Sequence, residues 1–255
     1  MKKTLLTTAI CILFVANGFT QNAYKINPND ERKSFVSVNL GLSIPTGNFG
    51  SKSFDNSESA YASTGFLFDV TYGYKISPNF GITAMWRNQA NGIDTDKYKQ
   101  DLEEYLDNHT NAFYPRAEIE AGSFKLNGIM VGLYTMLPVS KKTSFDTRVL
   151  LGYSLATTPS FSTVVYEYGT KSLTINRDRA ETGAFSYVIG AGLKKTVSEK
   201  TYLMVNIDFY SAKAKWKNVK ETAYSYRSGY YQTSKYDLSQ QLNTVNISIG
   251  LGKRF

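Results

Sequence analysis

Cysteine and histidine are almost absent from this sequence, and both scarcities exclude chemistry. Of the 255 residues, one is cysteine and one is histidine. Cys11 lies in an N-terminal apolar run that we expect to be removed, so the remaining chain can form neither a disulfide nor a thiolate metal site. No H-E-x-x-H, phosphate-loop or dinucleotide motif occurs, and no G-x-S-x-G nucleophile motif accompanies His109. The sequence therefore predicts no metal, no cofactor and no catalytic residue.

Long hydrophobic runs are missing as well. The run Leu5–Ala16 follows Met1-Lys2-Lys3 and has twelve residues, fewer than the about 20 that a transmembrane helix needs. A positive start, a short apolar run and a small-residue end predict a signal peptide over residues 1–20, cleaved between Gly18 and Gln21. Beyond it, the best apolar run is only Gly128–Tyr134. An exported chain of this kind is periplasmic, extracellular or a β-barrel of the outer membrane.

Acidic residues are fewer than basic ones, 21 against 29. The formal net charge is +8, and it falls to +6 when Lys2 and Lys3 leave with the signal peptide. A basic excess can mark a nucleic-acid-binding chain. Here the basic residues are scattered and an exported chain does not meet nucleic acid, so we expect no such partner.

What the chain does have is strict alternation, seen most clearly in Thr244–Phe255. One parity is aliphatic, and the other carries small residues: Val245, Ile247, Ile249 and Leu251 against Thr244, Asn246, Ser248, Gly250 and Gly252. This period of two predicts a β-strand with two unlike faces. The same ruler predicts eight strands: Phe35–Ile44, Gly65–Ile76, Phe80–Asn88, Lys125–Leu137, Phe145–Leu155, Ala184–Val197, Tyr202–Ala212 and Asn243–Lys253.

The connections between these strands alternate in length. The links after the second, fourth and sixth strands are short, at Ser77–Asn79, Pro138–Lys142 and Ser198–Lys200, whereas the other four links are long. Outer-membrane barrels show this asymmetry, with short periplasmic turns and long extracellular loops. The pattern predicts that both chain ends lie on the periplasmic side.

Charges and glycines fall on the less apolar parity of the predicted strands. A charge facing lipid at mid-membrane costs ~2–4 kcal/mol, so charges belong inside a barrel. The inward charges are Asp69, Lys75, Arg87, Asp146, Arg148, Asp208 and Arg254. An eight-stranded barrel is just wide enough for side chains to fill. We predict a closed ionic network of Asp69, Arg87, Arg148 and Asp208, joined by Asp146 from the periplasmic side, that plugs the lumen.

The closing strand ends on an aromatic residue, Phe255, after the alternating Ile247, Ile249 and Leu251. In this it resembles the last strand of small bacterial outer-membrane β-barrel proteins of the OmpA/OmpX and PorT-like type. Lys253 departs from that pattern, where an apolar residue would be usual. The resemblance covers Phe35 to Phe255 and transfers no catalytic residue.

The resemblance implies an all-β fold, an eight-stranded antiparallel up-and-down transmembrane β-barrel over residues 34–255, after a periplasmic segment at 21–33. It also implies a bacterial outer-membrane location, with membrane lipid and lipopolysaccharide as surroundings. The barrel-assembly machinery would read the C-terminal strand, with Phe255 as the signal.

Three of the four long links, numbered loops one to four in chain order, carry features of their own. Loop two is predicted to hold a short helix with the apolar stripe Tyr98, Leu102, Tyr105 and Leu106, which either folds over the rim or binds a partner. Loops three and four read as hairpins that extend the strands. In loop four, tyrosines and basic residues form a candidate binding surface: Tyr224, Tyr226, Arg227, Tyr230, Tyr231 and Tyr236.

These features favour a non-enzymatic surface barrel that presents its loops for adhesion or binding, with an unknown extracellular ligand. Three alternatives stay open: a narrow channel for small solutes, an outer-membrane component of a secretion assembly, and a membrane-embedded lipid hydrolase that would use His109.

Overall fold

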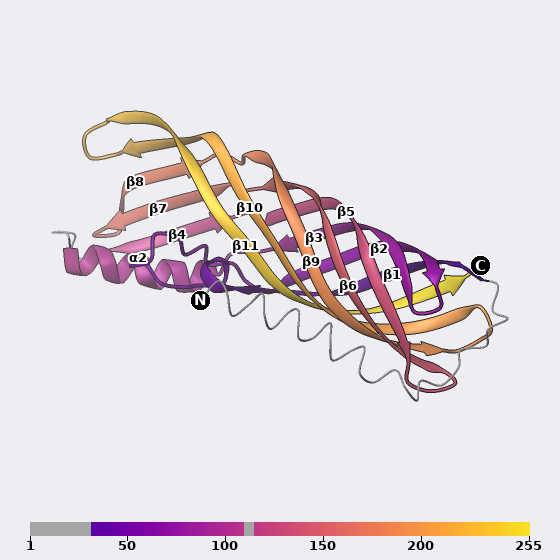
Figure 1. The fold of residues 1–255 in the computed structure, drawn as a ribbon. Helices are drawn as coiled ribbons and strands as arrows, with labels where there is room; N and C mark the ends of the chain where they lie inside the picture. The colour runs from indigo at the N-terminus through magenta and orange to yellow at the C-terminus, as the bar shows by residue number, and fades with distance from the viewer. Residues whose placement is uncertain (1–31, 110–114) are drawn as a thin grey trace.

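The computed structural model describes residues 32–109 and 115–255 (Figure 1). The predicted signal peptide, residues 1–20, and nearly all of the segment 21–33 lie outside the described residues. The described chain forms one antiparallel sheet of eleven strands with one α-helix. The all-β class is therefore confirmed, although the sheet has three strands more than the eight that the alternation predicted.

The elements follow one another along the chain with these bounds. They are β1 (Ser34–Thr46), the 3-10 turn η2 (Gly47–Phe49), β2 (Gly65–Ser77), β3 (Phe80–Asn91), α2 (Thr95–His109), β4 (Arg116–Ala121), β5 (Phe124–Pro138), β6 (Thr143–Thr157), β7 (Phe161–Glu167), β8 (Thr170–Arg177), β9 (Glu181–Thr196), β10 (Thr201–Ser225) and β11 (Tyr231–Arg254). No helix in this described part of the chain has the length and apolar character needed to cross a membrane.

Strand pairing leads back to its starting point. Antiparallel pairs run from β1 through β2, β3, β5, β6, β9 and β10 to β11, and β11 also pairs with β1. We call this ring of strands the barrel. It is uneven, because β10 and β11 have 25 and 24 residues, whereas β3 has 12 and β9 has 16. The register along β5 is continuous on both sides, so the buried Phe124, Leu126 and Met130 face the interior without a bulge.

Beyond the barrel the sheet continues at the end with the long connections. There β8 pairs with Glu221–Ser225 of β10, β7 pairs with β8, and β4 pairs with β7. We call β4, β7, β8 and residues 217–237 of β10 and β11 the extension; it lies to the left in Figure 1, with α2 alongside. The predicted strands Tyr202–Ala212 and Asn243–Lys253 were too short, because both continue into this region. The hairpin predicted in loop three is present as β7 and β8, whereas β4 was not predicted.

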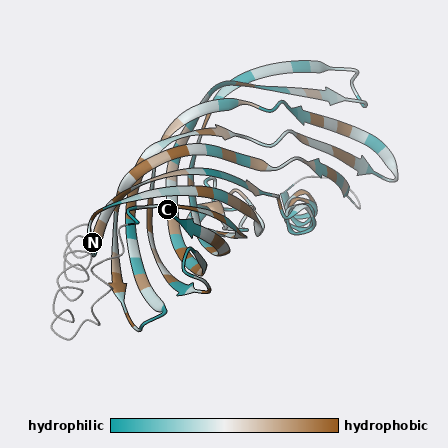
Figure 2. Cartoon of the chain, turned by 90° about the vertical axis from the view of Figure 1, so that its right-hand side faces the viewer, coloured by the Kyte–Doolittle hydropathy of each residue, from teal (hydrophilic) through white to brown (hydrophobic). Residues whose placement is uncertain are grey.

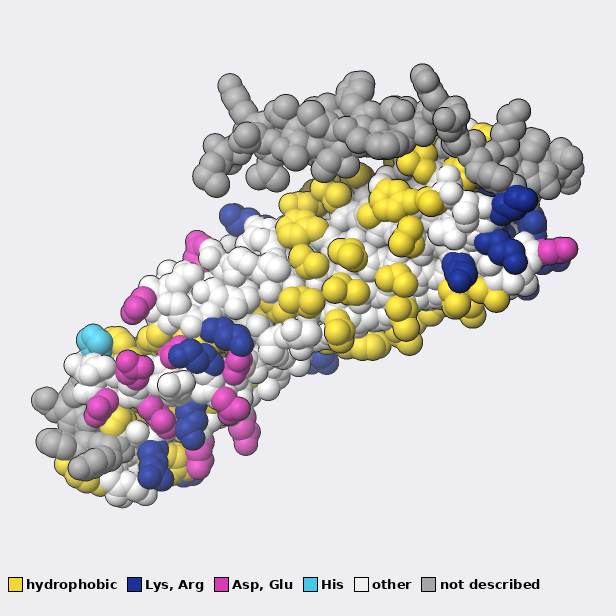
Figure 3. All heavy atoms as spheres, turned by 90° about the horizontal axis from the view of Figure 1, so that it is seen from below, with side chains coloured by type: hydrophobic (Ala, Val, Ile, Leu, Met, Phe, Trp, Pro, Cys, Tyr) yellow, Lys and Arg dark blue, Asp and Glu magenta, His cyan; other side chains and the backbone are white. Residues whose placement is uncertain are grey.

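The outer face of the barrel is apolar. Hydropathy alternates along the strands in Figure 2, and in Figure 3 apolar side chains cover the barrel between two charged ends. Side chains at the middle of several strands are about half exposed or more, including Leu40 (49%), Val131 (59%), Leu151 (52%) and Ile249 (67%). A folded protein in water rarely exposes so large a continuous apolar surface. The predicted outward parity is therefore the parity that the structure exposes.

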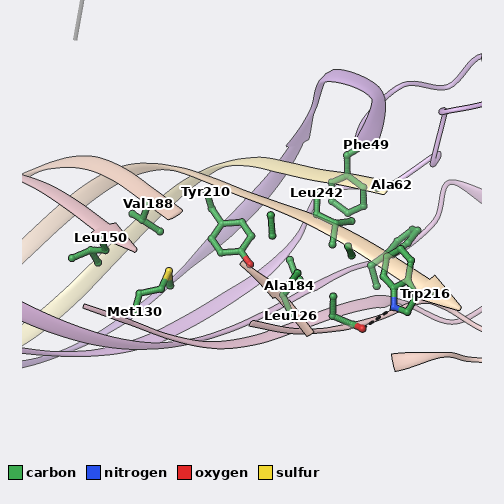
Figure 4. Packing of buried hydrophobic residues seen from close by; sticks show 14 of the residues in the cluster. Phe49, Ala62, Leu126, Met130, Leu150, Ala184, Val188, Tyr210, Trp216 and Leu242 are labelled. Carbon is green, nitrogen blue, oxygen red and sulfur yellow. Dashed lines mark hydrogen bonds between the residues drawn. The ribbon is translucent and has the colours of Figure 1, made fainter. Parts of the chain in front are cut away.

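The barrel interior is filled, as β10 shows along its length. Its inward-facing residues, starting from the short-turn end, are Tyr202, Met204, Asn206, Asp208, Tyr210, Ala212, Ala214 and Trp216, and every one is at most 3% exposed. Apolar side chains from the other strands pack against the part of this row from Tyr210 to Trp216, nearer the long connections. Figure 4 shows them spread through the interior, from Leu150 and Val188 to Trp216, whose indole N–H donates to the carbonyl of Ala156 at 2.8 Å.

A matched pair of substitutions tests whether the outer face of the barrel contacts lipid or water. Val131 lies mid-strand and is 59% exposed, whereas Val139 lies in the turn after β5 and is 63% exposed. If the mid-strand face contacts lipid, Val131→Arg should lower the free energy of unfolding by ~2–4 kcal/mol, while Val139→Arg should change it by less than about 1 kcal/mol. Urea unfolding in phospholipid vesicles measures both. Equal effects would mean that the two sites share the same surroundings.

Candidate functional site

Four of the predicted inward charges meet at the centre of the barrel. Arg148 donates to Asp208 through Nε to Oδ1 and through Nη2 to Oδ2, both at 2.9 Å, and Arg87 donates through Nη2 to the same Oδ2 at 2.6 Å. Arg87 also reaches Asp69 at 3.4 Å. All four side chains are at most 4% exposed. The structure thus brings together two carboxylates and two guanidinium groups, which balance in charge.

These side chains come from strands on different sides of the barrel. Asp69 and Arg87 lie opposite each other on β2 and β3, whereas Arg148 and Asp208 lie on β6 and β10, on either side of Gly190 in β9. A Cβ atom at Gly190 would lie 1.8 Å from Oδ1 of Asp208. The glycine therefore leaves the space in which Arg148 and Asp208 meet across β9. Asn39 extends the network by donating to Asp69 at 2.6 Å.

Asp146 does not join this network as expected. It pairs with Lys194 at 3.5 Å, and no hydrogen bond links it to Arg148 among the described contacts. The reason is its position: Asp146 lies opposite Gly192 in the β6–β9 register, two residues nearer the short-turn end than Gly190. Lys194 was missed in the sequence, although the outward Leu193 before it places Lys194 on the inward parity.

Three aromatic rings surround the Lys194 ammonium near the short-turn end. The Nζ atom lies 4.6 Å from the ring centre of Phe35, 5.6 Å from that of Tyr134 and 5.7 Å from that of Tyr202. A buried cation over ring faces gains electrostatic stabilisation of roughly 2 kcal/mol or more when desolvated. Together with Met136 and Met204, these rings form a second buried apolar cluster that fills the barrel below the ionic network.

The glycines on the inward parity make room for these rings. A Cβ at Gly252 would lie 2.2 Å from the Tyr202 ring, and a Cβ at Gly81 would lie 2.6 Å from the Tyr134 ring. Of the two inward charges predicted at the mouth, Arg254 is half-buried, with its guanidinium 5.3 Å from the Tyr202 ring centre. Lys75 is half-buried at the end of β2.

The predicted tyrosine surface is only partly assembled. Tyr224, Tyr226, Tyr230 and Tyr231 are exposed around the turn that joins β10 to β11, as is Arg227. The rings of Tyr224 and Tyr226 pack edge to face at 4.8 Å. Tyr236 does not belong to this surface, because it is half-buried and its hydroxyl donates to Glu221 at 3.0 Å. We call the five exposed residues the hairpin surface.

Helix α2 forms where the apolar stripe predicted it. Asp94 caps it by accepting the backbone N–H of Lys97 at 3.1 Å, and the ion pair Lys97–Asp101 forms at 2.6 Å. The hydrogen bond from Lys52 to Asp94 holds the pKa of that carboxyl below its ordinary value, so the cap stays charged to a more acidic pH than a free aspartate would. Asp94 also ties the helix to the loop that contains Lys52.

Two further predicted positions lie at opposite ends of the molecule. Phe255 is 55% exposed, and its backbone N–H and carbonyl both bond to Ser34 at 3.0 Å. His109 is exposed at the end of α2 and stacks on Tyr105 at 4.5 Å. Among the described residues no group of three or more histidine, cysteine, aspartate or glutamate side chains could hold a metal ion.

No protein-family model matches the chain, and no curated protein matches it. Among solved structures it is similar to the attachment invasion locus protein Ail of Yersinia pestis, with 15% identity, 88% of this chain and 99% of that chain covered, and a TM-score of 0.42. A major outer membrane protein of Thermus thermophilus shares 11% identity over 87% of this chain and 99% of its own, with a TM-score of 0.48. The outer membrane protein OprG of Pseudomonas aeruginosa shares 9% identity over 88% of this chain and 96% of its own, with a TM-score of 0.45.

The solved structures that this chain resembles are thus outer-membrane β-barrel proteins, the class that its sequence pattern resembled. At these identities and TM-scores no role of any of these proteins transfers to this chain. What the chain does has to be argued from its own interior and surface.

The ionic network makes a quantitative prediction. Arg148→Ala leaves the buried Asp208 carboxylate with one guanidinium partner, and breaking a buried ion pair in this way should cost ~3–5 kcal/mol of unfolding free energy. Arg179→Ala, at an exposed arginine of the loop before β9, is the control and should cost less than about 1 kcal/mol. Urea unfolding in vesicles compares them, and a loss of under about 1 kcal/mol for Arg148→Ala would mean that water reaches the network.

Proposed function

We propose that this chain is a non-enzymatic protein of the bacterial outer membrane, in which residues 34–255 form an eight-stranded transmembrane β-barrel exported by a signal peptide at residues 1–20. The eight strands of the ring cross the bilayer, and the extension stands above it on the outside of the cell. The continuous apolar belt supports this placement, because its side chains are half exposed along strands whose opposite parity is buried. The short turns between β2 and β3, β5 and β6, and β9 and β10 then face the periplasm.

The observation that carries the proposal is the filled interior. From Tyr202 to Trp216 every second residue of β10 is buried against side chains of the other strands. The ionic network fills the centre of the barrel interior, and the ring cluster around Lys194 fills the interior next to it, toward the short-turn end. This supports a barrel that acts as an anchor for what lies above it, in preference to a narrow channel for solutes.

The proposed role is to present the hairpin surface and the extension for adhesion or binding. Exposed tyrosines beside Arg227 supply apolar area, hydrogen-bonding groups and positive charge, a composition typical of binding surfaces. Membrane lipid and lipopolysaccharide are the proposed neighbours of the barrel. At the other end, the exposed Phe255 closes the last strand, where the barrel-assembly machinery would contact it.

Electrical recording tests the plug. The purified protein, refolded into planar bilayers, should show no steady single-channel current above that of protein-free bilayers treated with the same detergent. Arg148→Ala should raise the current from this low baseline, because it removes one of the side chains that fill the centre. Large, steady and ion-selective currents from the unsubstituted protein would contradict the plug and favour the channel.

Trypsin applied to intact cells tests the orientation. Arg227 lies exposed in the turn between β10 and β11, whereas Lys142 and Lys200 lie exposed in short turns at the opposite end. We expect cleavage after Arg227 in intact cells, and cleavage after Lys142 and Lys200 only once the outer membrane is permeabilised. Arg227→Gln should remove the first cut and serves as the control. Cleavage at Lys200 in intact cells would mean that the orientation is reversed, and recovery of the protein in the soluble periplasm would contradict the barrel itself.

A further inference from the structure

A cavity of about 430 Å³ lies outside the barrel interior, between α2, the loop before β2 and the extension. Sites for small molecules have volumes of about 300–1,000 Å³ and mostly apolar walls with a few polar groups. This cavity has that character. It shares no residue with the hairpin surface, so it is a second candidate site on the same end of the molecule.

One wall of the cavity is the apolar stripe of α2. Tyr98, Leu102 and Leu106 line it, yet the helix has no buried residue. A short amphipathic helix is normally stabilised by packing its stripe against a partner surface. The helix is held instead by its two tyrosine rings and by β4: Tyr98 packs edge to face on Tyr61 and Phe161, and Tyr105 packs on Phe54, each at 5.1 Å. The Glu103 carboxylate accepts the backbone N–H of Ala117 in β4 at 2.7 Å, and Leu102 and Leu106 line the cavity between these contacts.

The facing wall is the inner surface of the extension together with the adjoining residues of β11. Val165 on β7, Leu173 and Ile175 on β8, and Leu238 on β11 line the cavity there. Both walls are apolar, and space remains between them. From Tyr98 to Leu106 the helix axis runs about 12 Å at about 1.5 Å per residue, the length of an extended chain of about ten carbons.

Two charged side chains, Arg177 on β8 and Glu221 on β10, lie opposite each other in register and line the cavity. Glu221 faces inward because the bulge between Trp216 and Val219 shifts the parity of β10, with Asn218 at a φ of 54°. The Glu221 carboxylate already accepts the hydroxyl of Tyr236 at 3.0 Å.

The Arg177 guanidinium differs in that it has an unused donor. It lies 5.3 Å from the Phe161 ring centre, and its Nε is shielded from solvent without a hydrogen-bond partner among the described residues. A shielded N–H donor without an acceptor is unfavourable, and a carboxylate is the acceptor that arginine binds most strongly. The cavity therefore combines an apolar slot with the unmatched Arg177 donor and, opposite it, the Glu221 carboxylate that already accepts from Tyr236.

We propose that this cavity binds a slender apolar molecule that ends in one carboxylate, such as a medium-chain fatty acid. Its chain lies along the α2 stripe and fills the space before Val165 and Ile175. Its carboxylate accepts the free N–H of Arg177. A cationic amphiphile would meet Arg177 with the wrong sign, and a neutral alcohol would offer the Nε donor only an uncharged and therefore weaker acceptor than a carboxylate.

Photolabelling with a diazirine-bearing decanoate tests the site. The full protein is held in lipid nanodiscs, because detergent micelles would compete for an apolar cavity. We expect labelled peptides to map to α2 and to β7 and β8, and unlabelled decanoate to compete at concentrations at least tenfold lower than decanol. Label found only on lipid-facing barrel strands, or equal competition by decanol, would overturn the proposal.

Three variants localise the effect. Arg177→Gln should weaken competition by decanoate about tenfold and leave competition by decanol unchanged, whereas Arg179→Gln, two residues along and exposed, should change neither. Leu102→Trp fills the cavity without adding charge and should abolish labelling of β7 and β8. The heat-dependent gel mobility of a folded barrel confirms that each variant folds. Unchanged labelling in both Arg177→Gln and Leu102→Trp would overturn the site, whatever trypsin and conductance show about the barrel.

Discussion

The structure depends on one constraint, which is that a narrow ring of strands must fill its own interior. Charges excluded from the outer face have to be placed inside it, where an unpaired charge is costly. Asp208 meets this constraint by accepting from two arginines on different strands. Asp69 and Asn39 extend the same network, and Asp146 with Lys194 forms a second neutral pair below it. The inward position of Gly190 has the same cause, because the missing side chain leaves the space in which Arg148 and Asp208 contact each other.

Much of this could be predicted from the sequence, because a barrel strand has a side-chain period of two and faces two unlike surroundings. The outward parity, the glycine parity and the inward placement of Arg87 and Arg148 all follow from that period. Pairing partners inside the barrel were harder, since they depend on the stagger between strands. One step of two residues along β6 separates Arg148, which meets Asp208, from Asp146, which meets Lys194.

The extension was the least predictable part. β4 has the sequence Arg-Ala-Glu-Ile-Glu-Ala, which is rich in charge and bears little aliphatic signal, and it exists by pairing with β7 at the edge of the sheet. The bulge after Trp216 changes which parity of β10 faces inward. The alternation that holds from Tyr202 to Trp216 therefore predicts the wrong face for Val219 and Glu221. The cavity beneath α2 depends on the bulge, because the bulge places Glu221 in its wall. The helix and the hairpin of β7 and β8, which form its two walls, were predicted separately, but their position relative to each other was not.

The pairing of β1 with β11 has a consequence for how the chain folds. Phe35 lies opposite Arg254, and Ser34 exchanges two backbone hydrogen bonds with Phe255, so these contacts join residues almost the whole described length apart. Contacts of such high sequence separation are slow to form, because chain entropy is lost before the contact is gained. The hairpins β2–β3, β5–β6 and β9–β10 can form locally, but β1 keeps an unpaired edge until the final strand arrives. We therefore expect ring closure to be the last step, and until then an apolar, open-edged sheet has to be kept from self-association.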